Sequence, residues 1–102
     1  MDKKFIVKIH KTYRLVVAIC DFDLKGEVFE EGERQLDVST KFFEGDSVDE
    51  DELKEIIRDA RGDDATFYII GENSVDVTKS IGLVDEDGVL KIGGVPFALI
   101  LL

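Results

Sequence analysis

The sequence has little of the chemistry on which many small sites depend, because its 102 residues include one cysteine, Cys20, and one histidine, His10. A single cysteine excludes an internal disulfide, and with a single histidine it cannot supply the four ligands of a structural zinc site. This cysteine usage is typical of a reducing cytoplasm. We therefore predict a domain that has no metal or cofactor and that is stabilised by its apolar core alone.

Long apolar runs are also absent. The longest, VPFALILL at residues 95–102, is far shorter than the ~20 residues of a membrane-spanning helix. Lysines interrupt the N-terminal segment MDKKFIVKIHK, which therefore lacks the apolar centre of a signal peptide. We expect a cytoplasmic protein with no membrane partner. Residues 95–102 predict a paired strand. If this strand lies at a sheet edge, it would pair with the same strand of a second copy in a homodimer.

Thermolabile residue types are scarce as well, with one asparagine, one glutamine and one methionine in a chain that is 35% charged. Proteins of hot habitats show the same avoidance and the same richness in charge. The composition therefore predicts a thermophilic source.

Charge is unevenly spread along the chain. There are 13 basic and 23 acidic residues, which gives a net charge of -10. Residues 1–14 contain five basic residues and one acidic residue, a local charge of +4, so the rest of the chain carries -14. An acidic surface repels nucleic acid. Binding of RNA would therefore be confined to the N-terminal segment.

Two strands are predicted in that segment. In residues 5–10 the alternate positions 5, 7 and 9 are all apolar and positions 6, 8 and 10 are mixed, which indicates a strand with one buried and one partly wet face. Residues 15–20 are continuously apolar and indicate a central strand. A short turn at Lys11 and Thr12 would join them as a hairpin. The residues gathered near its end are Lys8, His10, Lys11, Tyr13 and Arg14. They suit RNA, since the cations can meet phosphates and the rings can stack on bases. The alternative is that the lysines only protect an edge strand from pairing.

One helix is predicted from Asp49 to Gly62. Asp49 with Glu52 forms a capping box, and Leu53, Ile57 and other apolar residues fall on one stripe. Glycine at position 62 ends the helix.

Residues 65–94 predict a strand, a helix and a second strand. The apolar run 65–70 ends at Gly71, Asn73 with Asp76 marks a helix start, and Gly82 marks its end. With the other elements this order predicts an α+β two-layer sandwich, in one domain, with a mixed, mostly antiparallel sheet and two short helices.

The start of this second helix is the other candidate site. Free backbone N–H groups there can receive an anion, so Glu72, Asn73 and Ser74 are candidate ligand residues. If strands 15–20 and 65–70 pair antiparallel, as we predict, Arg14 would share a cleft with them. A small metal-independent enzyme with a pocket between Gly71 and Ser74 is therefore the alternative function.

Two other patterns are weaker indications of a functional site. His10, Cys20 and Asp21 are the residue types of a nucleophile with its base, but an apolar strand end predicts an inert thiol. The residues that follow Asp21 begin like a calcium loop, yet the twelfth position is Gly32 and lacks the bidentate glutamate.

Five motifs along the chain are HKTYR, VVAICD, GENSV, GLVDE and IGGVPFA. Through them the sequence resembles the archaeal family catalogued as domain of unknown function 424. The resemblance covers nearly the whole chain and implies an archaeal, cytoplasmic, single-domain protein. The family brings no catalytic or binding residues with it. Our leading prediction is a non-enzymatic binding or accessory domain with RNA, the translation machinery or a protein as its partner.

Overall fold

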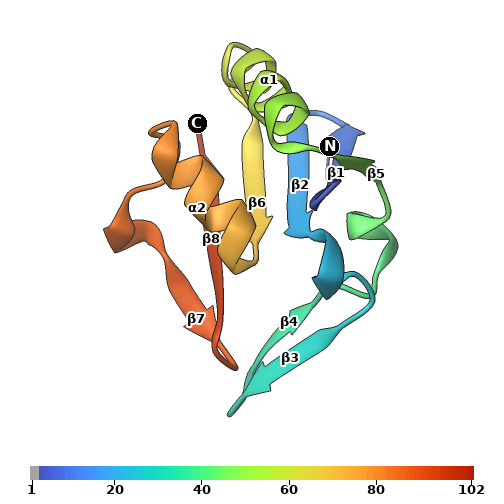
Figure 1. The fold of residues 1–102 in the computed structure, drawn as a ribbon, viewed down its shortest axis with the longest axis vertical. Coiled ribbons are helices and arrows are strands. Elements are labelled where there is room, and N and C mark those ends of the chain that lie inside the picture. The colour runs from blue at the N-terminus through green and yellow to red at the C-terminus, as the bar shows by residue number, and fades with distance from the viewer. Residues whose placement is uncertain (1–2) are drawn as a thin grey trace.

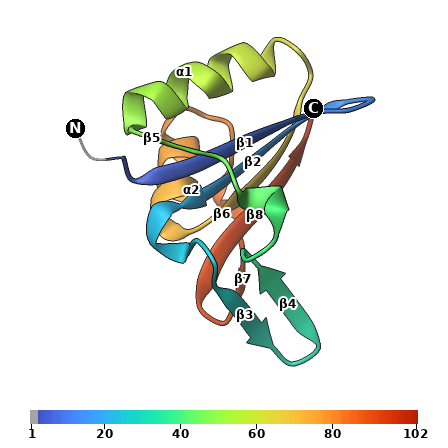
Figure 2. The ribbon, with the colours of Figure 1, turned by 90° about the vertical axis from the view of Figure 1, so that its right-hand side faces the viewer.

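One mixed sheet of six strands is the centre of the molecule, with two helices on one face and a separate two-stranded hairpin towards the other (Figures 1 and 2). The computed structural model describes residues 3–102. The strands of the sheet, in spatial order, are β5 (Asp46–Val48), β1 (Phe5–Lys11), β2 (Leu15–Asp21), β6 (Thr66–Ile70), β8 (Val95–Leu101) and β7 (Leu90–Ile92). The hairpin is β3 (Val28–Glu31) and β4 (Arg34–Asp37), and the helices are α1 (Glu50–Arg61) and α2 (Glu72–Ser80). The predicted α+β fold is confirmed.

The central strands β2 and β6 are neighbours, as expected, but they run parallel, from Val16 opposite Thr66 to Cys20 opposite Ile70. The predicted antiparallel pairing is therefore wrong. The reason lies in the connection, because α1 carries the chain back across the sheet before β6 begins, and such crossovers join parallel strands. All other pairs in the sheet are antiparallel.

The apolar strand β8 is paired, which confirms that prediction. It is antiparallel to β6 along five residue pairs, from Leu101 opposite Thr66 to Phe97 opposite Ile70. On its other side it pairs with β7 only at residues 95–97. The strand is thus paired along its whole length, but it has a strand on both sides only at Phe97. Within the described chain, residues 98–101 have no strand on that outer side.

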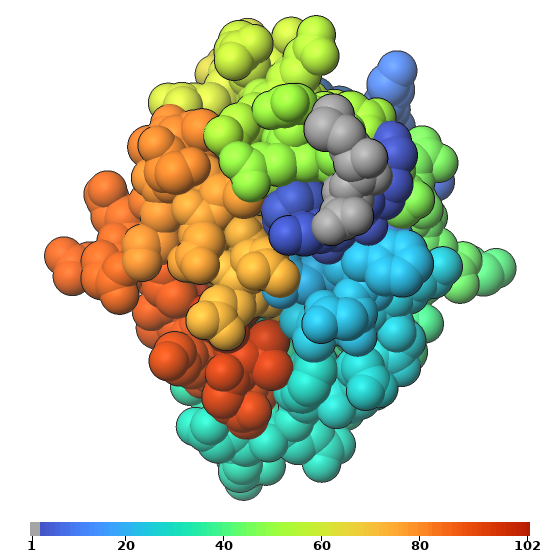
Figure 3. Space-filling model, viewed as in Figure 1, coloured from blue at the N-terminus to red at the C-terminus, as the bar shows by residue number. Residues whose placement is uncertain are grey.

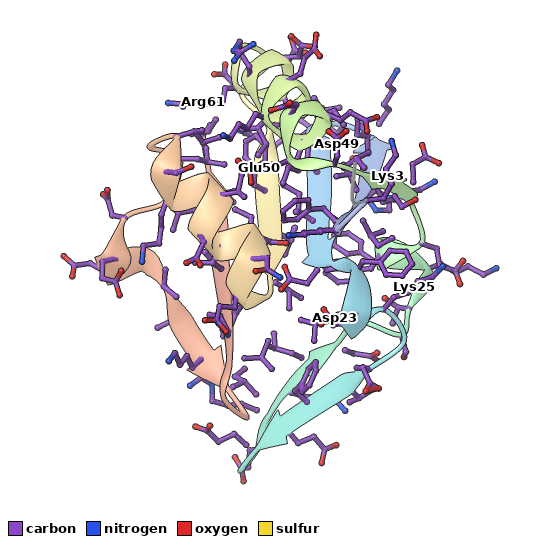
Figure 4. The ribbon with its side chains drawn as sticks, viewed as in Figure 1. Lys3, Asp23, Lys25, Asp49, Glu50 and Arg61 are labelled. Atoms are coloured by element: carbon purple, nitrogen blue, oxygen red, sulfur yellow. The ribbon has the colours of Figure 1, made fainter. Side chains whose placement is uncertain are left out.

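Helix α1 follows the sequence closely. Asp49 caps it, since its side chain accepts from the Glu52 amide at 2.8 Å while Glu52 accepts from the Asp49 amide at 3.1 Å. Lys3 pairs with Glu52 beside this cap, at the start of the helix (Figure 4). The predicted apolar stripe faces the sheet, with Leu53 and Ile57 fully buried.

Helix α2 begins earlier than predicted. Gly71 occupies the N-cap position, and Asn73 lies inside the first turn, so the predicted helix start at Asn73 with Asp76 is wrong. The cap comes from another part of the chain, as described below.

The core has two parts, one on each face of the sheet. Between the sheet and the helices lies the larger part, which includes Phe5, Phe67 and Ile69. From the helix side, the side chains of α1 and α2 cover much of the sheet (Figure 3). The smaller part joins Ile6, Cys20, Ile70 and Ile92 of the sheet to the β3–β4 hairpin and the turn of residues 41–43. It covers one end of the sheet face and leaves the other end open.

Among residues 3–102, no helix combines the length and the apolar character that crossing a bilayer requires.

Candidate functional site

The predicted anion site at the start of α2 is occupied by a carboxylate of the same chain. Asp21, at the end of β2, accepts hydrogen bonds from the Asn73 amide at 3.0 Å and the Ser74 amide at 2.7 Å. The Ser74 hydroxyl also donates to Asp21, at 2.6 Å. Asp21 and Ser74 are buried. The two amides that an external anion would use are therefore already satisfied.

Gly71 permits this contact. Its φ of +115° lies in the region that favours glycine. A Cβ atom at this position would lie 2.4 Å from the Asp21 Cγ atom. The helix start and the carboxylate are thus packed too closely for a side chain between them. Glu72, beside them, is exposed and lines a hollow of about 210 Å³ with Lys79 and Glu86, which pair with each other.

Arg14 lies far from this helix start. Asp21, at the end of β2, contacts the helix. Arg14 lies seven residues before Asp21, and at 3.3 Å per residue of strand the separation between them is about 23 Å. The predicted cleft shared by Arg14 and Glu72 is therefore wrong. Arg14 instead donates to the main-chain oxygens of Leu102 at 2.6 Å and Asp64 at 3.1 Å. It ties the ends of β2, β6 and β8 together.

Cys20 and His10 also lie at opposite ends of their strand pair, since Cys20 is opposite Ile6 and His10 is opposite Val16. Cys20 is fully buried. Burial, and secondarily the negative charge of Asp21, raises the pKa of the Cys20 thiol to about 12. At neutral pH the group is a thiol, which is the unreactive form.

The basic hairpin residues divide into two groups. Lys8 and His10 are on the sheet face away from the helices, on the same side as Ile6. Lys11, Tyr13 and Arg14 are at the tip, which projects past the end of the sheet (Figure 2). Tyr13 is fully exposed, and it lines a hollow with Arg14, Asp63 and Asp64.

His10 belongs to an aromatic cluster that the sequence did not reveal. The His10 ring stacks on Phe42, with centroids 4.5 Å apart and planes 12° from parallel. Tyr68 of β6 meets Phe42 edge to face at 5.0 Å. The His10 Nε2 atom lies 3.0 Å from the Phe42 main-chain oxygen, and because a carbonyl only accepts, Nε2 carries the hydrogen. Tyr68 lies in a continuous apolar strand, which gave no periodic signal of an exposed face.

The uncovered end of this sheet face carries no acidic side chain. Strand alternation and register place one set of residues on it, and we name this set the open face: Lys8, His10, Val16, Tyr68, Leu99 and Leu101. Its two ionisable groups other than the tyrosine are Lys8 and His10, both basic types. At the outer edge of β1, Lys8 also borders a hollow of about 320 Å³, which it shares with Glu44 and Asp46. In a chain of net charge -10, the open face is therefore apolar with basic but no acidic members, and acidic residues border it only beside Lys8 among the neighbours named here.

The sequence matches the family described as "Protein of unknown function (DUF424)" over residues 9–102. The chain belongs to this family. It is also similar to a solved structure, the crystal structure of an uncharacterized conserved protein from the archaeon Methanopyrus kandleri. The two share 31% sequence identity with a TM-score of 0.83, over 95% of this chain and 91% of that chain. No curated protein matches the chain. The resemblance seen in the motifs is confirmed.

Two of those motifs in this DUF424 protein now have a structural meaning. The aspartate of VVAICD caps the helix that begins in GENSV. In residues 3–102, no three histidine, cysteine, aspartate or glutamate side chains are grouped to hold a metal ion. What the geometry does offer is a surface, the open face with the adjacent hairpin tip.

Proposed function

We propose that this DUF424 protein is a non-enzymatic binding domain whose ligand is RNA, held through the basic N-terminal hairpin. The observation that supports it is the segregation of charge. The chain carries 23 acidic residues, yet none lies on the open face. Acidic side chains elsewhere repel a polyanion and direct it to this surface.

Lys8 and Lys11 are the phosphate-binding residues in this proposal. Lys8 is half-buried on the open face and Lys11 is exposed near the tip. Arg14 has a structural task, because its guanidinium donates to two main-chain oxygens. Tyr13, fully exposed between Lys11 and Arg14, offers a ring to a base.

The test is the salt dependence of binding. A labelled RNA with single-stranded and paired parts is titrated with protein at several salt concentrations. We expect affinity to fall steeply with salt, and the double variant Lys8→Ala with Lys11→Ala to reduce the log–log slope by roughly one unit per lost contact.

A matched control is the double variant Lys25→Ala with Lys91→Ala. It removes the same charge from two exposed lysines outside the hairpin. Equal losses in the two double variants would mean a general charge effect and would refute the site. Absence of binding at low salt would refute the function.

Two other predictions concern a homodimer and an enzyme. A homodimer through the C-terminal strand stays a prediction, and β7 limits it to residues 98–101 of β8. For the enzyme alternative, the amides at the start of α2 already donate to Asp21, so we propose no reaction there.

A further inference from the structure

We infer that the open face binds unpaired bases, so that the RNA it takes is single-stranded and a base stacks on Tyr68. This inference rests on the proposed function and specifies the form of its ligand.

The first observation is an apolar surface on the neighbouring strands β6 and β8. Tyr68 is 38% exposed, Leu99 opposite it on β8 is 48% exposed, and Leu101 is 71% exposed. Strands in a parallel pair, such as β6 with β2, ordinarily have both faces covered. Here the β3–β4 hairpin covers the end with Cys20 and Ile70 and leaves these three side chains in solvent.

The second observation is that the ring of Tyr68 is held in place. Phe42 contacts Tyr68 edge to face and stacks on His10, and the hydrogen bond between His10 and the Phe42 main chain fixes that stack. A ring whose orientation is fixed loses little entropy when a base packs on it. The cluster is therefore a preformed stacking surface.

Charge identifies the occupant. Lys8 and His10 lie on β1, two strands from Tyr68, which at 4.8 Å per strand is about 10 Å. An extended strand of RNA that stacks a base on Tyr68 reaches Lys8 with a neighbouring phosphate. A second copy of the chain fits poorly, because two open faces packed together would bring their Lys8 side chains into the same interface.

A duplex fits poorly as well. Its bases are stacked inside, and its shallow groove presents hydroxyl groups and base edges, which Leu99 and Leu101 cannot bond. Unpaired bases instead offer flat apolar faces to the tyrosine and the two leucines.

The experiment compares a labelled single strand of about 12 nucleotides with the duplex of the same sequence, by fluorescence anisotropy at low salt. We expect the single strand to bind at least tenfold more tightly. Loss of one stacked base corresponds to a loss of about 10- to 100-fold, so Tyr68→Leu should weaken single-strand binding by that factor without changing the salt slope. Tyr68→Phe, which keeps the ring, should restore binding.

Two controls separate stacking from other effects. Phe22→Leu removes an aromatic side chain that is 50% exposed but lies outside the open face, and it should leave affinity unchanged. The chain has no tryptophan and two tyrosines, so in a Tyr13→Phe protein the tyrosine emission comes from Tyr68 alone. Stacking should quench it, and equal melting temperatures verify that each variant is folded.

The outcomes are distinct. If single strand and duplex bind equally and Tyr68→Leu has no effect, while binding remains salt-dependent, base stacking is refuted and the proposed function survives. If no RNA binds at low salt, both are refuted.

Discussion

Removal of the Asp21 carboxylate should destabilise the whole domain. Its three hydrogen bonds satisfy the Asn73 amide and both the amide and the hydroxyl of Ser74, which is fully buried. In Asp21→Ala the two Ser74 donors lose their partner, at about 1 to 3 kcal/mol each, and the favourable charge at a helix N-terminus is also lost. We expect a decrease of about 3 to 5 kcal/mol in the free energy of unfolding.

Asp21→Asn should cost less. Its amide oxygen can keep the two contacts with Ser74, but its NH₂ group would meet the Asn73 amide, donor against donor. A decrease of about 1.5 to 3 kcal/mol follows from one lost hydrogen bond to a charged group.

The assay is urea unfolding followed by circular dichroism, with thermal melting as a second measure. For a domain of this size each kcal/mol lowers the melting temperature by about 4 to 8 °C. The matched control is Asp23→Asn, two residues along in an exposed turn (Figure 4), where a surface substitution should change stability by no more than about 0.5 kcal/mol. Should Asp21→Ala be as stable as Asp23→Asn, the carboxylate does not hold the helix start.

Two further predictions concern buried contacts of the same region. Gly71→Ala should destabilise far more than Gly82→Ala, because both positions have positive φ but only at Gly71 would the new Cβ meet other atoms, so equal losses in chemical denaturation would show that close packing against Asp21 is unimportant. Cys20, fully buried and with its pKa raised to about 12, should react with a thiol reagent at neutral pH only at the rate of unfolding, and rapid labelling of the native protein would contradict its placement.

The sequence predicts an element well where all of its signals are local. Helix α1 has its cap, its apolar stripe and its terminating glycine within 14 residues, and the structure reproduces them. Helix α2 is capped by Asp21, which lies 52 positions before Asn73 and 53 before Ser74, the residues whose amides it accepts from. No local pattern could reveal a cap at that separation. The nearby asparagine was the best local substitute and was therefore misassigned.

The candidate site shows the same limit. The basic residues of the hairpin are contiguous enough to be found from charge alone. The aromatic cluster assembles from three separate segments, with His10 from β1, Phe42 from the turn of residues 41–43 and Tyr68 from β6. Which face of β6 stays uncovered depends on where the β3–β4 hairpin packs, and that is a property of the tertiary structure.

The parallel pairing of β2 and β6 also bears on how the domain forms during synthesis. About 45 residues separate Asp21 from Thr66, and closing a segment of that length carries an entropic cost that local hairpins avoid. The β1–β2 hairpin can form as soon as it leaves the ribosome, but β2 then shows an unpaired apolar edge until β6 has been made. We therefore expect the N-terminal half of the growing chain to be the part most prone to aggregation.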